Sequence, residues 1–259
     1  TMGDIARCSI GRSDEVHNEE LLYRLFGVNA ELLIDHAWGW EPCTIADVKS
    51  YKPENKSIVS GQVLQCPYGF EKARLVVREM ADALALDLVD KGLVTDQLTL
   101  TVGYDIENFS DPERRRAYAG PVTTDPYGRK IPKHGHGTAN LEGCTSSASD
   151  LLEAVSGLYD RVVDPSLLIR RLTISANRLL DEISAREKEA PEQLDLSTDY
   201  AAQQKQAEEK AAAHAKERKL QEAMLGVKKR YGKNVILKGM NLEEGATAKE
   251  QNEKIGGHQ

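Results

Sequence analysis

Residues that could do chemistry are few and scattered in this chain of 259 residues. His134 and His136 stand two apart in a glycine-rich stretch, so in a strand both would point to one face. They could ligate a metal ion, but no cysteine or carboxylate nearby completes a compact ligand set, and we favour a polar surface role. The closest carboxylate pairs fit ordinary ends of helices and strands: Asp87 with Asp90, and Asp105 with Glu107. We therefore expect no catalytic residue, no metal and no cofactor in this chain.

The composition favours a water-soluble, cytoplasmic protein. Hydrophobic residues make up 40% of the chain and charged residues 29%, and no apolar run approaches the ~18 residues of a membrane span. The four cysteines lie far apart without a CxxC pair, which predicts reduced thiols rather than disulfides or zinc ligands. Net charge is -7, so any binding to nucleic acid must come from a local face.

A periodic segment between residues 57 and 105 predicts a strand, a helix and a second strand. Residues 57–64 are the first strand, and residues 68–90 form one long helix because apolar residues recur every three or four positions. In the second strand, residues 97–104, Leu98, Leu100 and Val102 alternate with polar side chains. A sheet with one apolar and one polar face has helices on one side only.

The segments that follow complete a β-α-β-β-α-β order. A polar excursion over residues 105–128 leads to a basic, glycine-rich strand over 129–138, a helix capped within 144–147 and an alternating strand over 168–177. This order is that of the ferredoxin-like split arrangement. The predicted class is therefore α+β, with a small helical N-terminal module, a four-stranded antiparallel sheet with two helices on one face, and a helical or disordered tail.

The chain is expected to divide into three parts. Residues 1–52 contain short helices separated by glycine turns, with Asn29 as the expected cap of one helix; a helix-hairpin-helix that holds a DNA phosphate and a plain helical bundle both fit. A polar linker precedes the domain of residues 57–182. Residues 187–259 form a polar tail in which 201–230 favour a helix with little apolar face.

The polar face of the predicted sheet is the candidate DNA-binding site. Its hydroxyls, amides and few cations suit phosphate oxygens, and the lack of aromatic residues argues against base stacking. Between Ser57 and Glu182 there are 14 Lys and Arg against 18 Asp and Glu, so this hypothesis requires that the acids lie on the helical side. Residues 114–116, three arginines, form either a solvated turn or a phosphate-contacting hairpin tip. The candidate DNA-binding residues are Lys56, Ser57, Ser60, Thr99, Thr101, Lys133, His134, His136, Thr138, Arg171, Thr173, Ser175 and Asn177.

Several long motifs resemble the junction of thumb and little finger in Y-family translesion DNA polymerases, most closely the UmuC-type branch of Gram-positive bacteria. The resemblance covers essentially the whole chain. The motifs are Gly3-Asp4-Ile5-Ala6, Leu25-Phe26-Gly27, Ala37-Trp38-Gly39-Trp40-Glu41-Pro42, Lys56-Ser57-Ile58, Ser60-Gly61-Gln62-Val63-Leu64, and the stretches at residues 88–97, 120–125 and 231–242.

The resemblance implies a DNA-gripping fragment of an enzyme of DNA damage repair and bypass. Residues 1 to about 52 would be the end of the thumb, and about 57 to 182 the little finger, which grips template and primer backbones beside a lesion. The family's catalysis uses palm carboxylates that hold two metal ions, Mg²⁺ in the parent enzyme. Those segments precede the thumb, so we expect this chain to be truncated and to have no polymerase activity of its own.

A short peptide in the tail resembles the one by which bacterial polymerases engage the sliding clamp. Its residues are Gln193, Leu194, Asp195 and Leu196, and Ser197 stands where the family peptide has an aromatic residue. Clamp binding is therefore expected to be weak, and a solvated linker is the alternative. A protein-interaction module that binds the clamp or a recombination partner is the second hypothesis for the chain, beside binding of primer-template DNA.

Overall fold

The computed structural model describes residues 1–51, 56–125, 127–188 and 200–253. It divides into two compact units, Thr1–Glu54 and Asn55–Gln259, and the border falls in the predicted linker. The tail after residue 200 belongs to the second unit.

The first unit is a set of short helices around a small core of Cys8, Leu22 and Ala30. Thr1 and Asp4 form a capping box at the start of the first helix. Gly27, with φ +59, ends the second helix and opens the turn to the third. The prediction that Asn29 caps the third helix is wrong, because Asn29 is its first residue and Val28 precedes it without a side-chain cap. The helices are α1 (Met2–Ser9), α2 (Glu19–Phe26), α3 (Asn29–Ala37) and α4 (Ile45–Ser50).

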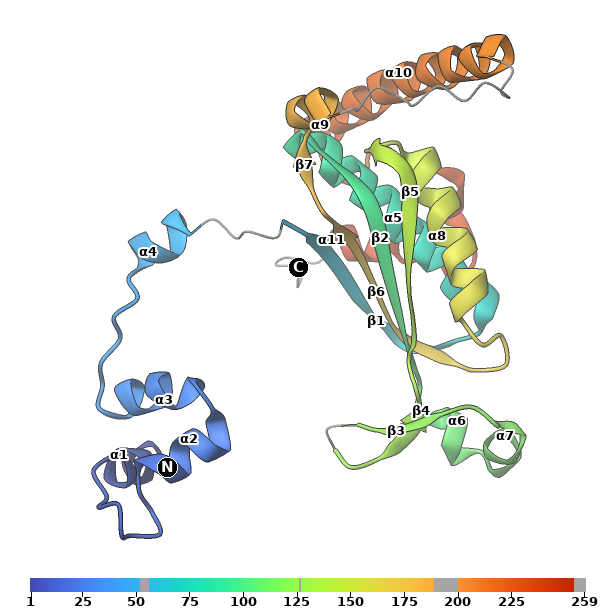
Figure 1. Cartoon of the computed structure of the whole chain (residues 1–259). Coiled ribbons are helices and arrows are strands. Elements are labelled where there is room, and N and C mark those ends of the chain that lie inside the picture. The colour runs from blue at the N-terminus through green and yellow to red at the C-terminus, as the bar shows by residue number, and fades with distance from the viewer. Residues whose placement is uncertain (52–55, 126, 189–199, 254–259) are drawn as a thin grey trace. The chain divides into compact units, whose positions relative to one another are not determined.

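The second unit is built on an antiparallel sheet with the strand order β1-β6-β2-β5 (Figure 1). The last long strand, β6, lies between β1 and β2, so the crossover from β1 to β2 passes over one intervening strand. The crossover from β5 to β6 passes over β2 in the same way. A two-residue strand, β7 (Leu180–Asp181), extends the pairing at the start of β2. The long strands are β1 (Ile58–Tyr68), β2 (Leu93–Tyr104), β5 (Gly135–Thr145) and β6 (Ile169–Asn177).

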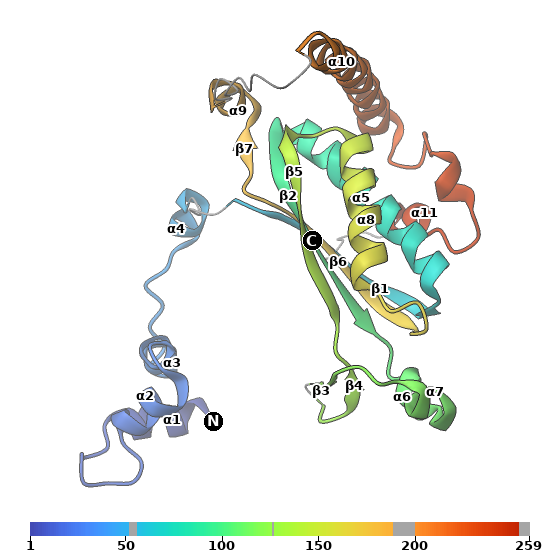
Figure 2. The same ribbon diagram turned by 45° about the vertical axis from the view of Figure 1, so that its right-hand side comes forward.

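Two helices cover one face of this sheet, as predicted (Figures 1 and 2). The first, α5 (Phe70–Lys91), ends at Gly92, which adopts the left-handed conformation with φ +65. The second, α8 (Ala148–Val162), is capped by Ser147, whose side chain accepts the N–H of Asp150. The core between helices and sheet holds the alternating residues of β2 and β6 and the largest buried side chain, Tyr159. Its hydroxyl donates to the carbonyl of Phe70 at 2.8 Å and so ties the two helices together.

The polar excursion between β2 and β5 is a separate small hairpin with two short helices (Figure 1). Its tip is closed by Asp125, which accepts the backbone N–H groups of Tyr127 and Arg129 and the Arg129 side chain at 2.7–2.9 Å. Arg114–Arg116 lie exposed on α7 and not at this tip, so of the two alternatives the hairpin tip is excluded. The elements are α6 (Glu107–Ser110), α7 (Pro112–Ala117), β3 (Val122–Thr124) and β4 (Lys130–Pro132).

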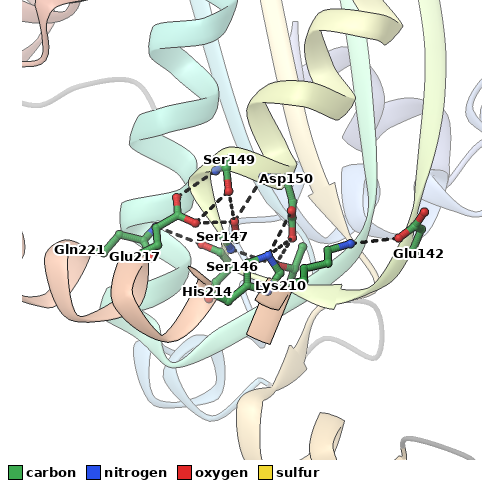
Figure 3. Close-up of polar contacts among 10 residues, drawn as sticks. Glu142, Ser146, Ser147, Ser149, Asp150, Lys210, His214, Glu217 and Gln221 are labelled. Atoms are coloured by element: carbon green, nitrogen blue, oxygen red, sulfur yellow. Dashed lines mark hydrogen bonds and ion pairs between the residues drawn. The ribbon is translucent and has the colours of Figure 1, made fainter. Parts of the chain in front are cut away.

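The predicted tail helix exists as α10 (Tyr200–Tyr231), and it docks on the turn from β5 to α8 (Figure 3). Side chains of α10 spaced at three or four residues face this turn. The Glu217 carboxylate accepts the backbone N–H of Ser149 at 3.0 Å and the hydroxyls of Ser147 and Ser149 at 2.7 and 2.9 Å. Gln221 donates to the carbonyl of Ser146 at 3.1 Å. Glu217 therefore supports the first turn of α8 from outside.

The segment after α10 lies on the outer face of α5. Glu79 of α5 is 4% exposed and accepts hydrogen bonds from the Asn241 side chain and the Thr247 backbone N–H, both at 2.7 Å. Asp82, 7% exposed, pairs with Lys238. Asp82 is therefore buried by the tail rather than by the sheet. The remaining elements are α9 (Glu182–Lys188), the 3₁₀ turn η1 (Gly239–Leu242) and α11 (Ala248–Glu253).

The described helices include none with the length and apolarity to cross a bilayer.

Candidate nucleic-acid interface

The uncovered face of the sheet, here called the open face, carries polar side chains in register across β6, β2 and β5. Pairing places Thr138, Thr99 and Ser175 in one row and His136, Thr101 and Thr173 in the next. The neighbouring positions of β1 are Val59 and Gly61. The paired positions that make up the open face are Val59, Gly61, Val63, Gln97, Thr99, Thr101, Gly103, His136, Thr138, Asn140, Arg171, Thr173, Ser175 and Asn177.

Side chains on the open face hold one another by hydrogen bonds along and between strands. The Asn177 amide donates to the Thr99 hydroxyl at 2.8 Å, and the Ser175 hydroxyl donates to Asn177 Oδ1 at 2.7 Å. The Thr101 hydroxyl lies 2.9 Å from His136 Nδ1. These bonds fix the rotamers of short side chains whose unused donor and acceptor sites point to solvent. Such groups contact phosphate and sugar oxygens without reading bases.

Charge is distributed unequally between the two sides of the unit. Eight of the eighteen acidic residues and five of the fourteen basic residues between Ser57 and Glu182 lie on α5 and α8, so these helices carry a net charge of -3 on the side away from the open face. The paired positions of the open face include Arg171 but no carboxylate. Residues 107–133, which form the hairpin region below β2 and β5, carry six basic and four acidic side chains. The hypothesis of DNA binding requires the acidic residues to lie on the helical side of the sheet, and this distribution meets that requirement in part.

Eight of the thirteen predicted DNA-binding residues come together at paired positions of the open face. Lys133 and His134 are exposed just before β5. Ser60 pairs with Ile174, so its side chain lies on the helix-covered face, and its place in the predicted set is wrong. Lys56 pairs with Asp181 at 3.6 Å at the edge of the sheet, beside the exposed Ser57. The eight are Thr99, Thr101, His136, Thr138, Arg171, Thr173, Ser175 and Asn177.

The structure adds residues to the open face that the sequence reasoning left out. Gln97 donates to Asn140 Oδ1 at 2.9 Å, and Arg178 donates to the same oxygen at 2.7 Å. Arg178 also pairs with Asp96 at 2.9 Å and has a positive φ of 50. Gln97 lies two residues before Thr99, and Asn140 lies two residues after Thr138, so both continue the alternation of the predicted residues. Extending that alternation along each strand would have predicted both. The left-handed backbone at Arg178 has no sequence signal.

The other candidate sites are the two histidines considered as metal ligands and the clamp-binding residues. The His134 and His136 rings lie edge to face with centroids 6.3 Å apart. Within the described ranges, no group of three or more His, Cys, Asp or Glu side chains is placed to hold a metal ion. The predicted clamp-binding residues 193–196 lie outside the described residues.

Comparison with known proteins identifies the family. Residues 55–196 match the impB/mucB/samB family C-terminal domain, and they make up more than half of the chain. The match begins at the border between the two units and covers the whole sheet with both of its helices. No curated protein matches the chain. The chain thus belongs to the impB/mucB/samB family and contains the C-terminal region of a Y-family DNA polymerase.

Proposed function

We propose that this chain grips primer-template DNA for a UmuC-type translesion polymerase, with the open face against the sugar-phosphate backbone. The palm and its catalytic Mg²⁺ ions would belong to other parts of the parent enzyme. In this proposal the chain has no polymerase activity alone and positions DNA beside a lesion for the palm.

The observation that carries the proposal is the open face itself. It is a pre-organised surface of hydroxyls and amides with Arg171 and no carboxylate at its paired positions, and the helices lie on the other side of the sheet. Hydroxyl, amide and guanidinium donors are the groups that contact phosphates, and they carry no sequence information. A surface of this kind supports binding that depends on the shape and charge of the duplex rather than on its sequence.

Measuring DNA affinity at several salt concentrations tests the proposal. We expect Lys133→Ala with Arg171→Ala to weaken binding and to reduce the slope of log Kd against log salt by about 2, because each phosphate contact contributes about 0.9. The matched control is Arg78→Ala with Lys91→Ala, which removes the same charge from α5 on the helical side.

The control separates a local contact from the effect of net charge. If both double variants weaken binding equally, the open face is not the contact surface and the proposal fails. Binding that is unchanged in Lys133→Ala with Arg171→Ala has the same consequence. Sequence-independent binding lost only in the open-face variant supports it.

The sliding clamp is a second proposed partner, through residues 193–196. The sequence Gln193-Leu194-Asp195-Leu196 supports this contact, with Ser197 weakening it. We expect an immobilised clamp to retain the chain weakly and Leu194→Ala with Leu196→Ala to abolish retention. Retention that survives this double change would exclude the peptide as the binding segment.

A further inference from the structure

An open cleft of about 630 Å³ lies at the root of the hairpin, where β4 leads into β5. Its size falls in the range of about 300–1,000 Å³ typical of sites for small ligands. We call it the hairpin-root cleft. Side chains of both aromatic and cationic character line it: Tyr104, Tyr118, Lys133, His134, His136 and Arg161.

One aromatic ring in the hairpin-root cleft is held in place. The Tyr118 hydroxyl donates to the carbonyl of Pro121 at 2.9 Å, and its ring packs against Phe109 with centroids 5.6 Å apart. A side chain at Gly120 would place Cβ 2.5 Å from Cζ of this ring, so any other residue there would displace the ring. Burial raises the pKa of the Tyr118 phenol, which therefore stays a neutral hydrogen-bond donor. The ring is a fixed apolar surface at the wall of the cleft.

Cations lie around the same cleft. Lys133 is anchored by its backbone N–H, which donates to the carbonyl of Pro121 at 2.8 Å, and its side chain is exposed. Arg161 reaches over from α8 and donates to the carbonyl of Thr138 at 3.0 Å. The carboxylate in the lining, Asp164, accepts hydrogen bonds from the N–H and hydroxyl of Ser166 in its own turn. An anion entering the cleft thus meets two cations beside an aromatic ring.

The hairpin-root cleft is continuous with the open face. His136 lines the cleft and also bonds Thr101 within the rows of the open face. Building on the proposed function, we propose that this cleft takes one unpaired nucleotide of the template strand, with its base against Tyr118 and its phosphate between Lys133 and Arg161. Aromatic stacking is tolerant of base identity, as binding of any template requires. The sheet then grips the duplex while the cleft holds the strand that leaves it.

Two DNAs with the same duplex test this, one blunt and one with a single-stranded template overhang. We expect the full chain to bind the overhang DNA about 10-fold more tightly than the blunt DNA, the size of one base stacked on an aromatic residue. Tyr118→Leu should bring the two affinities together and leave the blunt affinity unchanged. Tyr118→Phe should keep the preference, because the ring remains. A 2-aminopurine at the first unpaired position should lose fluorescence when the wild-type chain binds.

The outcomes separate this inference from the proposed function. Equal wild-type affinity for both DNAs, or no change in 2-aminopurine fluorescence, overturns the nucleotide site and leaves the open face standing. A preference that survives Tyr118→Leu overturns it as well. Lys133→Ala with Arg171→Ala should weaken binding of both DNAs, and a wild-type chain that binds neither DNA refutes the proposed function together with the cleft.

Discussion

The attachment of the tail to α5 depends on one buried carboxylate, and replacing it is the sharpest test of the fold. Both oxygens of Glu79 are in use: Oε1 accepts from the Asn241 amide, and Oε2 accepts from the backbone N–H of Thr247, each at 2.7 Å. Glu79→Gln keeps the size of the side chain but replaces one oxygen by an NH₂ group. In either orientation of the new amide, its NH₂ group faces another donor, either the Asn241 amide or the Thr247 backbone N–H.

The Asn241 side chain cannot easily turn to relieve this conflict. Its own Oδ1 already accepts the backbone N–H of Lys238 at 2.8 Å, so a flip would break that bond. A hydrogen bond to a charged group contributes about 1.5–3 kcal/mol, and an unsatisfied buried donor costs a similar amount. The total loss of stability is limited, because the tail can detach from α5 and its N–H donors can then bond to water. We therefore expect Glu79→Gln to lower the free energy of unfolding by about 2–3 kcal/mol.

Urea unfolding and amide hydrogen exchange measure this effect. For a unit of this size the melting temperature should fall by roughly 4–12 °C. If the tail detaches from α5 in the variant, the Thr247 amide hydrogen should exchange roughly 30- to 100-fold faster than in the wild-type chain. The matched control is Glu153→Gln at an exposed position of α8, which should change stability by less than about 0.5 kcal/mol. Equal stabilities for the two variants would refute the assigned role of Glu79.

Two further predictions concern stability. Burial opposes ionisation of Glu217, but hydrogen bonds from Ser147 and Ser149 outweigh it and hold its carboxyl pKa below the ordinary value of 4.5. A lowered pKa in the folded state adds stability above the ordinary pKa, so Glu217→Gln should lower the free energy of unfolding near neutral pH. The difference in unfolding free energy between variant and wild type should shrink as acid protonates the wild-type carboxylate. A difference in urea unfolding that does not depend on pH would contradict this. Gly135→Ala would put Cβ 2.7 Å from the carbonyl of Val162, so we expect a loss of about 1–3 kcal/mol, whereas Gly143→Ala meets nothing within 4 Å and should cost less in the same thermal melts.

The two alternating strands could be predicted well because their signal is local. In β2, Leu98 and Leu100 are fully buried, and Thr99 between them faces outward. This period of two fixes the face of each side chain before any partner strand is known. The first strand lacks the signal, since Ile58 and Val59 are both apolar and Ser60 and Gly61 are both small. The face of Ser60 therefore depends on its pairing with β6, which no local pattern reveals.

The docking of the tail is the part of the fold that local reasoning missed. A second stripe runs along α5 at helical spacing, and its members are buried: Leu75, Glu79, Asp82 and Leu86. A stripe that mixes leucines with acids resembles an ordinary solvent-facing surface. It becomes recognisable only when the partner is known, because Lys238 and the amide groups of the tail satisfy the carboxylates.

The unequal placement of acids has a consequence for how the second unit would meet a polyanion. A net charge of -3 on the two helices behind the sheet and of +2 on the hairpin region beside it give this part of the unit an electric dipole, even though the charge between Ser57 and Glu182 is negative overall. In the field of a duplex such a body experiences a torque that turns its acidic side away. Encounters would therefore be biased toward a single orientation before any contact forms, and added salt would slow capture by weakening this alignment.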